Sequence, residues 1–167
     1  MDKPSLFEPP PIVLIVMAEP EQLMAVSNCL HEAGYIYQEH ARGALEASRI
    51  LAGGSVSMVL ANYEDTSWRD ILRATTLQSP APKLTLGIQF SKLGSLICEM
   101  VLEAGAYNVL ARPYRGSEVL QALGFAWQAW ARDRVRQSGA APSKVRGLRN
   151  TPSVEHRLVG ATKSSAA

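Results

Sequence analysis

A small set of polar side chains closely follows short apolar runs of the sequence, and these residues are the best placed to do chemistry. They are Glu19, Asn62, Glu64, Asp65, Gln89 and Arg112. Carboxylate oxygens are good ligands for hard cations such as Mg²⁺, so Glu19, Glu64 and Asp65 could gather one near Asn62. The alternative, which we favour, is that these three acids are solvated residues of turns.

Other reactive patterns are not found in the sequence. It has no catalytic triad, glycine-rich phosphate loop or zinc pattern, and His31, His40 and His156 lack the spacing of a metal site. Cys29 and Cys98 are too few for a disulfide scaffold or a thiolate metal site. We expect Cys98 to be a small core residue, the alternative being a redox-sensitive thiol. We therefore expect a protein that is not an enzyme and that holds no metal or cofactor.

The elements that must position these residues alternate along the chain. Apolar runs rich in β-branched residues predict strands over 12–17, 35–37, 56–61, 83–88 and 107–111. Helical spacing of apolar residues predicts helices over 20–33, 44–51, 66–77, 93–104 and 117–135. Such alternation predicts an α/β fold, with a parallel sheet covered by helices on both faces. Functional residues then gather at the carboxyl ends of the strands.

Charge is distributed unevenly over the 167 residues. Residues 136–167 have a net charge of +5, whereas residues 1–135 have a net charge of −3. The basic segment is rich in Ser, Gly, Pro and Ala, as a flexible linker is, and without a recognition helix we expect no direct nucleic acid binding. No apolar run is long enough to cross a bilayer and no leader precedes the first strand, so we expect a cytoplasmic protein without a membrane partner.

The segment 102–114, which reads LEAGAYNVLARPY, carries a family resemblance. It is similar to the helix end, fifth strand and closing Lys-Pro-Phe of the receiver domains of bacterial response regulators. The run 13–16 with Glu19-Pro20 resembles their first strand and acidic turn. The resemblance spans about residues 11–133 and implies a flavodoxin-like (CheY-like), doubly wound sheet of five strands with five helices.

The resemblance also implies where a phosphorylation pocket would lie, and the chain departs from the family there. Asn62 stands in place of the aspartate that attacks phosphorus, and a neutral carboxamide cannot form an acyl phosphate. Met17 and Ala18 stand where an acidic pair would hold Mg²⁺, which leaves Glu19 as the only acid of that turn.

The last two strands depart from the family in the same way. Where a Thr or Ser should end the fourth strand, the sequence offers Ile88, Gln89 or Phe90, and Arg112 replaces a lysine. Arg112 could pair with Glu19 or Glu64 and hold the pocket shut, or point to solvent. The resemblance implies a cis peptide before Pro113. We therefore expect a degenerate pocket without phosphotransfer, formed by Met17, Ala18, Glu19, Asn62, Gln89, Arg112 and Pro113.

The predicted helix 117–135 is apolar around much of its circumference. One stripe contains Trp127 and Trp130, and a second stripe of alanines and Val119 runs beside it. One stripe must cover the sheet, so we expect one tryptophan in the core and the other at an interface, where tryptophan is enriched. Since receiver domains usually dimerise through this surface, the resemblance implies a homodimer interface formed by Leu96, Met100, Tyr107, Trp127 and Trp130.

The end of the chain carries a second, shorter resemblance. The residues 156–162, HRLVGAT, are similar to the start of the ATPase domain in sigma-54-dependent enhancer-binding regulators. We therefore expect an extended lead-in over 1–11, a receiver-like domain over 12–135 and a basic linker over 136–167. The function expected is a phosphorylation-independent regulatory and dimerisation domain of a transcription regulator, attached to ATPase and DNA-binding domains. The alternatives are a conventional two-component receiver with a weak metal or phosphodonor response and a stand-alone adaptor.

Overall fold

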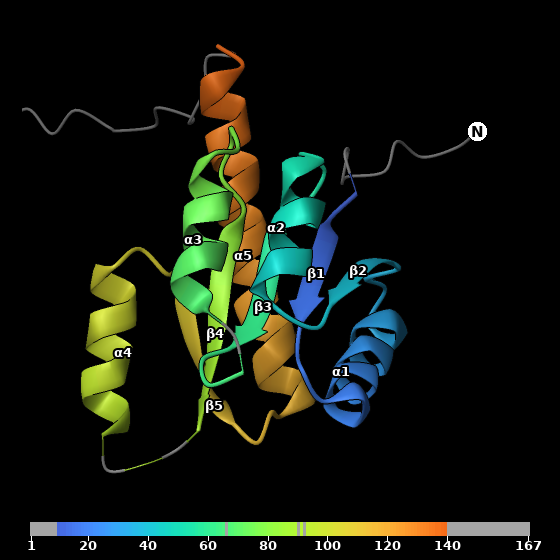
Figure 1. Ribbon diagram of the computed structural model, residues 1–167. Helices are drawn as coiled ribbons and strands as arrows, with labels where there is room; N and C mark the ends of the chain where they lie inside the picture. Colours follow the sequence, from blue (N-terminus) through green and yellow to red (C-terminus); the bar gives the residue numbers. More distant parts are fainter. Residues whose placement is uncertain (1–9, 66, 90, 92, 140–167) are drawn as a thin grey trace, which may run out of the picture.

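The computed structural model describes residues 10–65, 67–89, 91 and 93–139. Strands and helices alternate along these residues (Figure 1). The strands are β1 (Ile12–Val16), β2 (Tyr37–Ala41), β3 (Met58–Asn62), β4 (Lys83–Gln89) and β5 (Asn108–Arg112). The helices are α1 (Pro20–Glu32), α2 (Ala44–Ala52), α3 (Trp68–Thr76), α4 (Gly94–Glu103) and α5 (Gly116–Gln137).

The five strands form one parallel sheet in the order β2-β1-β3-β4-β5. Helices α1 and α5 cover one face, and α2, α3 and α4 lie on the other (Figure 1). The predicted α/β, doubly wound, flavodoxin-like sheet is therefore confirmed. Because the strand order reverses on either side of β1, the carboxyl ends of β1 and β3 border the crevice where such sheets place their functional groups.

The inner strands β1 and β3 are apolar because both of their faces are buried. In β1, Val13 and Ile15 pack into the core beneath α1 and α5, while Leu14 and Val16 pack into the core beneath α2 and α3. Every residue of β3 is likewise buried. A strand buried on both faces needs an uninterrupted apolar run, which is the pattern that predicted these strands.

The strand predicted over 35–37 is wrong, because β2 covers Tyr37–Ala41. β2 is an edge strand that pairs only with β1, and Ala41 is its one buried residue. Its exposed face accommodates polar residues, so no apolar run marks it in the sequence. Tyr35 instead closes α1, since its N–H donates to the Leu30 carbonyl at 2.9 Å and its ring packs against the core.

The last helix continues past its predicted end at residue 135, because α5 reaches Gln137. Residues 1–9 of the predicted lead-in over 1–11, and most of the predicted linker with its 156–162 motif, lie outside the described residues. Within the described part of the chain, no helix combines the length and the apolar character needed to cross a membrane.

Candidate functional site

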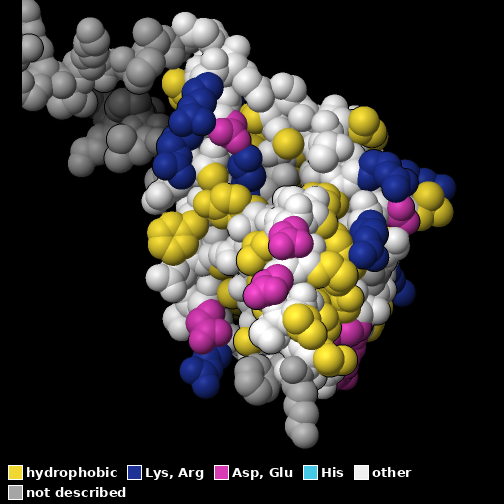
Figure 2. Space-filling model, turned by 90° about the vertical axis from the view of Figure 1, so that its left-hand side faces the viewer, with side chains coloured by type: hydrophobic (Ala, Val, Ile, Leu, Met, Phe, Trp, Pro, Cys, Tyr) yellow, Lys and Arg dark blue, Asp and Glu magenta, His cyan; other side chains and the backbone are white. Residues whose placement is uncertain are grey.

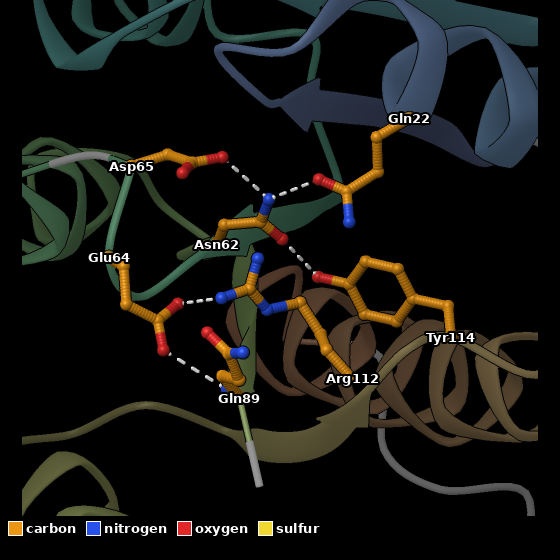
Figure 3. Close-up of polar contacts among 7 residues, drawn as sticks. All are labelled: Gln22, Asn62, Glu64, Asp65, Gln89, Arg112 and Tyr114. Atoms are coloured by element: carbon orange, nitrogen blue, oxygen red, sulfur yellow. Dashed lines mark hydrogen bonds and ion pairs between the residues drawn. The ribbon is translucent and has the colours of Figure 1, made fainter.

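Asn62 ends β3, and its side chain is completely buried. Its amide nitrogen donates two hydrogen bonds of 2.7 Å, one to the Gln22 carboxamide oxygen in α1 and one to the Asp65 carboxylate. Its carbonyl oxygen accepts a hydrogen bond of 2.5 Å from the Tyr114 hydroxyl (Figure 3). Residues from α1, from the loop after β3 and from the segment before α5 therefore converge on one carboxamide.

Tyr114 reaches Asn62 because β4 has a glycine at the neighbouring position. The strand register pairs Gly87 of β4 with Asn62 of β3. A Cβ atom at residue 87 would lie 1.8 Å from the Tyr114 hydroxyl oxygen and 2.5 Å from Cζ of its ring. Any side chain at this position is therefore incompatible with the present placement of Tyr114, which fills the space beside Asn62.

The environment of Tyr114 keeps its hydroxyl protonated. Burial raises the pKa of the Tyr114 phenol far above its usual value of 10.0, and the nearby Arg112 guanidinium opposes this only in part. The carboxylates of Asp65 and Glu64 raise the pKa further. The hydroxyl is thus a permanent donor at neutral pH, which suits the carbonyl oxygen of Asn62.

Arg112 and Glu64 form an ion pair at the rim of this pocket (Figure 3). The Arg112 side chain is only 14% exposed, and Glu64 is 38% exposed. The second Glu64 oxygen accepts a hydrogen bond of 3.0 Å from the backbone N–H of Gln89. Of the alternatives left open for Arg112, pairing with Glu64 is therefore the one that the structure contains, and it joins the ends of β4 and β5 to the loop after β3.

This architecture was compared with known protein families, curated proteins and solved structures. The sequence matches no protein-family model and no curated protein. A CheY-like receiver domain protein from Methanospirillum hungatei JF-1 matches with a TM-score of 0.63 and 20% identity, over 74% of this chain and 98% of that one. The signal receiver domain of an HD domain-containing protein from Pseudomonas fluorescens Pf-5 matches with a TM-score of 0.67 and 22% identity, over 81% and 99%. The chain has a receiver-domain fold.

The same fold also matches part of a longer protein. NtrX from Brucella abortus in complex with ATP matches with a TM-score of 0.65 and 14% identity, over 77% of this chain but only 29% of that one. The receiver fold is therefore one portion of the NtrX chain. At these identities the likeness establishes the fold alone, and the chemistry of this chain must be judged from its own residues.

The residues of this receiver fold do not fit a bound Mg²⁺ ion. Met17 is buried among apolar side chains, while Ala18 and Glu19 are exposed on the turn after β1. Glu64 is engaged by Arg112 and Gln89, and Asp65 by Asn62. No group of three or more metal-ligating side chains occurs among the described residues. The alternative that Glu19, Glu64 and Asp65 gather a divalent ion is therefore not the arrangement found.

Other predicted residues of the receiver pocket differ in role. The register places Gly87, two residues before Gln89, beside Asn62, so Gln89 contributes a backbone N–H at the rim rather than a wall of the pocket. The Arg112–Pro113 peptide is cis, as predicted. Three residues of the pocket, Gln22, Gly87 and Tyr114, were not predicted from the sequence. Of these, only Tyr114 lies in a segment that the sequence singles out, because it follows Pro113 at the end of the 102–114 motif.

The predicted interface residues of the receiver fold divide into two groups. Leu96 is 63% exposed and Tyr107 is 37% exposed, while Met100 is partly buried. Trp127 and Trp130 are both only 8% exposed, and their rings stack 5.3 Å apart within the core beneath α1 and α5. The expectation that one of them lies at an exposed interface is therefore wrong.

Packing explains this correction. The two indole rings lie side by side and both apolar stripes of α5 are largely buried, because one helix covers a wide area of the sheet and also meets α1. The exposed aromatic residue of α5 is instead Phe125, at 51%. Its carbonyl accepts a hydrogen bond of 3.2 Å from the Tyr107 hydroxyl, so Phe125 adjoins the predicted interface.

Proposed function

We propose that this chain is a receiver-like regulatory domain that works without phosphorylation. One observation carries the proposal: the place of the phosphoacceptor is held by a buried carboxamide, Asn62, whose surroundings are filled by Gln22 and Tyr114. The Tyr114 hydroxyl lies where the side chain of a Thr or Ser on β4 would begin. A phosphoryl group would have to displace Tyr114 and would find a carboxamide that cannot accept it.

The domain is proposed to act as a docking and dimerisation module, without enzymatic activity of its own. Hydrophobic side chains gather on the side of the molecule that carries α4, with acidic side chains among them (Figure 2). The exposed apolar residues of this α4–β5–α5 face are Leu93, Leu96, Leu102, Tyr107 and Phe125. Large apolar side chains exposed together commonly mark interaction sites, so we place the homodimer interface here.

The output is proposed to be an attached transcription-activating ATPase with a DNA-binding domain. The support for this is the short motif at 156–162 and the occurrence of the fold within NtrX, a longer protein crystallised with ADP and with ATP. In this arrangement α5 runs into the linker that joins the domain to its output domain. A change in the α4–β5–α5 face would then alter how two output domains are held together.

Incubation with a small phosphodonor such as phosphoramidate and Mg²⁺, followed by intact-protein mass spectrometry, tests phosphorylation independence. We expect no stable phosphoryl group on the wild-type chain. Incorporation that disappears in Asn62→Ala would refute the proposal and favour the conventional receiver. Incorporation that persists in Asn62→Ala would locate the modification elsewhere and leave the pocket assignment intact.

The homodimer has its own test in sedimentation equilibrium. Leu96→Glu places a charge on the α4–β5–α5 face and should shift the chain toward the monomer. Leu45→Glu is the matched control, because Leu45 is 70% exposed but lies on α2, away from that face. Equal association of the wild type and both variants would show that the α4–β5–α5 face is not a dimer interface. That result would favour a stand-alone adaptor.

A further inference from the structure

A cavity of about 610 Å³, open to solvent on one side, lies between part of α4 and the ends of β4 and β5. Its floor is formed by Ile88 of β4 together with Val109 and Ala111 of β5, and its opposite wall is formed by Cys98 and Leu102 of α4. This cavity is distinct from the Asn62 pocket, which is filled by Tyr114. It is also distinct from a smaller cavity of about 230 Å³ between α1 and the start of α5, where Cys29 lies.

The cavity exists because α4 is loosely packed. Val101 is the only fully buried residue of this helix, whereas α5 buries seven. Figure 1 shows α4 standing apart from the other helices at the β5 edge of the sheet. Small-molecule sites are concave and commonly lie between packed elements, so this open space between α4 and the sheet is a candidate binding site.

The chemistry of the lining limits what could bind. None of the described residues that line the cavity carries a charge, and the polar ones are Gln89, Ser91, Ser95 and Asn108. Small-molecule sites typically have volumes of about 300–1,000 Å³ and mostly apolar walls with a few polar groups. We propose that this cavity binds an uncharged, largely apolar small molecule that serves as the input signal of the domain.

This inference rests on the proposed function, because a domain that takes no phosphoryl group needs another input. The position of the cavity suits that role. Gln89 lines the cavity, and its backbone N–H also donates to Glu64, which pairs with Arg112 at the rim of the Asn62 pocket. A ligand held between α4 and β5 would favour one position of α4, and with it one arrangement of the exposed Leu96.

The first test uses the full chain and Nile red, an uncharged apolar dye whose emission rises when it leaves water. We expect saturable binding of one dye per chain. Thiol alkylation followed by peptide mass spectrometry then locates the dye, since the two cysteines line different cavities. Bound dye should slow the modification of Cys98 and leave Cys29 unchanged. Absence of saturable binding, or protection of Cys29 instead, would overturn the assignment.

Two variants at one position sharpen this test. Cys98→Trp should fill the cavity and weaken dye binding by about tenfold or more, whereas Cys98→Ala should leave it within about twofold. Should circular dichroism show that Cys98→Trp is unfolded, Ser95→Trp serves instead, because Ser95 is exposed on α4 and lines the same cavity. Unchanged affinity in the folded tryptophan variant would contradict the proposal. A chain that binds no dye but also takes no phosphoryl group would refute the ligand site alone.

Discussion

Neighbouring residues at the end of β4 border two very different spaces, one filled and one open. At Gly87 the chain leaves out a side chain, and Tyr114 fills the space and joins a closed hydrogen-bonded network with Asn62. At Ile88 and Gln89 the strand instead borders a cavity of about 610 Å³ beneath α4. The pocket at the carboxyl end of β3 is therefore filled, while the neighbouring space beneath α4 is open.

This difference indicates that the Asn62 pocket is a rigid part of the domain, whereas α4 is the part that can move. A filled pocket whose central carboxamide is hydrogen-bonded at both ends contributes to stability and resists rearrangement, since opening it would leave buried polar groups without partners. A helix with one fully buried residue and a few partly buried ones, as α4 has, can move at a smaller free-energy cost than a helix buried along its length. Substitutions in the Asn62 pocket should therefore lower the free energy of unfolding strongly, and substitutions on the outer face of α4 only weakly.

The largest effect is expected from Gly87→Thr. The new Cβ would lie within 2 Å of Tyr114, since the hydroxyl oxygen is 1.8 Å away, so the ring must leave the pocket. Overpacking together with the lost hydrogen bond should lower the free energy of unfolding by about 2–5 kcal/mol, measured by urea denaturation. Gly43→Thr is the control, because no heavy atom lies within 4 Å of a Cβ there and it should cost little. Equal stability of both variants would mean that Tyr114 does not occupy this position.

Tyr114→Phe should lower the free energy of unfolding by a smaller amount, about 1–2 kcal/mol, because it removes only the hydrogen bond to Asn62. Tyr37→Phe, at a half-exposed position on β2, should be nearly neutral. Urea denaturation of the two variants compares these losses directly, and similar values would argue against a buried hydroxyl bond.

The same hydroxyl predicts a pH dependence. Burial raises the pKa of Tyr114 in the folded chain above its value of 10.0 in the unfolded chain. Stability from this group is therefore complete below pH 10 and is lost as the pH rises above it, because only the unfolded state then releases the proton. The loss should approach about 1.4 kcal/mol per pH unit. Tyr114→Phe should reduce this slope; Tyr35, whose pKa burial also raises, accounts for part of what remains.

Loss of the Arg112–Glu64 ion pair should lower the free energy of unfolding by about 1 kcal/mol. Arg112→Ala removes the ion pair with Glu64, in which the Arg112 side chain is only 14% exposed. Arg115→Ala removes a pair with Glu118 whose partners are 80% and 44% exposed, and it should have no measurable effect. Thermal unfolding of both variants checks the difference; the reverse order would mean that the rim is not part of the network.

The smallest effect is expected at Leu96→Ala, because this side chain is 63% exposed on α4. Measured at protein concentrations where the chain is monomeric, the free energy of unfolding of this variant should stay within about 0.5 kcal/mol of the wild type. Leu123→Ala, at a fully buried position of α5, should cost about 2–5 kcal/mol by comparison. A large loss at Leu96 in urea denaturation would mean that α4 is held as firmly as the rest of the fold.

The sequence predicted most of the fold because the inner strands are buried on both faces and the helices carry apolar stripes. It failed at β2, where an edge position permits polar residues such as Gln38 and Glu39. It identified Asn62 and Arg112 from strand ends alone. Gln22 and Gly87 carry no such signal, because their roles depend on a register and a side-chain direction that only the folded chain defines. The burial of both tryptophans likewise depends on how α1 and α5 meet.

The central claim is that the pocket is blocked by its own side chains as well as by the missing aspartate. The most direct test is phosphodonor treatment of Asn62→Asp with Mg²⁺, read by intact-protein mass spectrometry. We expect no stable phosphoryl group, because Tyr114 still fills the pocket and Met17 and Ala18 still offer no carboxylate to Mg²⁺. Stoichiometric phosphorylation of Asp at position 62 would contradict it, and would show that a single residue separates this domain from a conventional receiver.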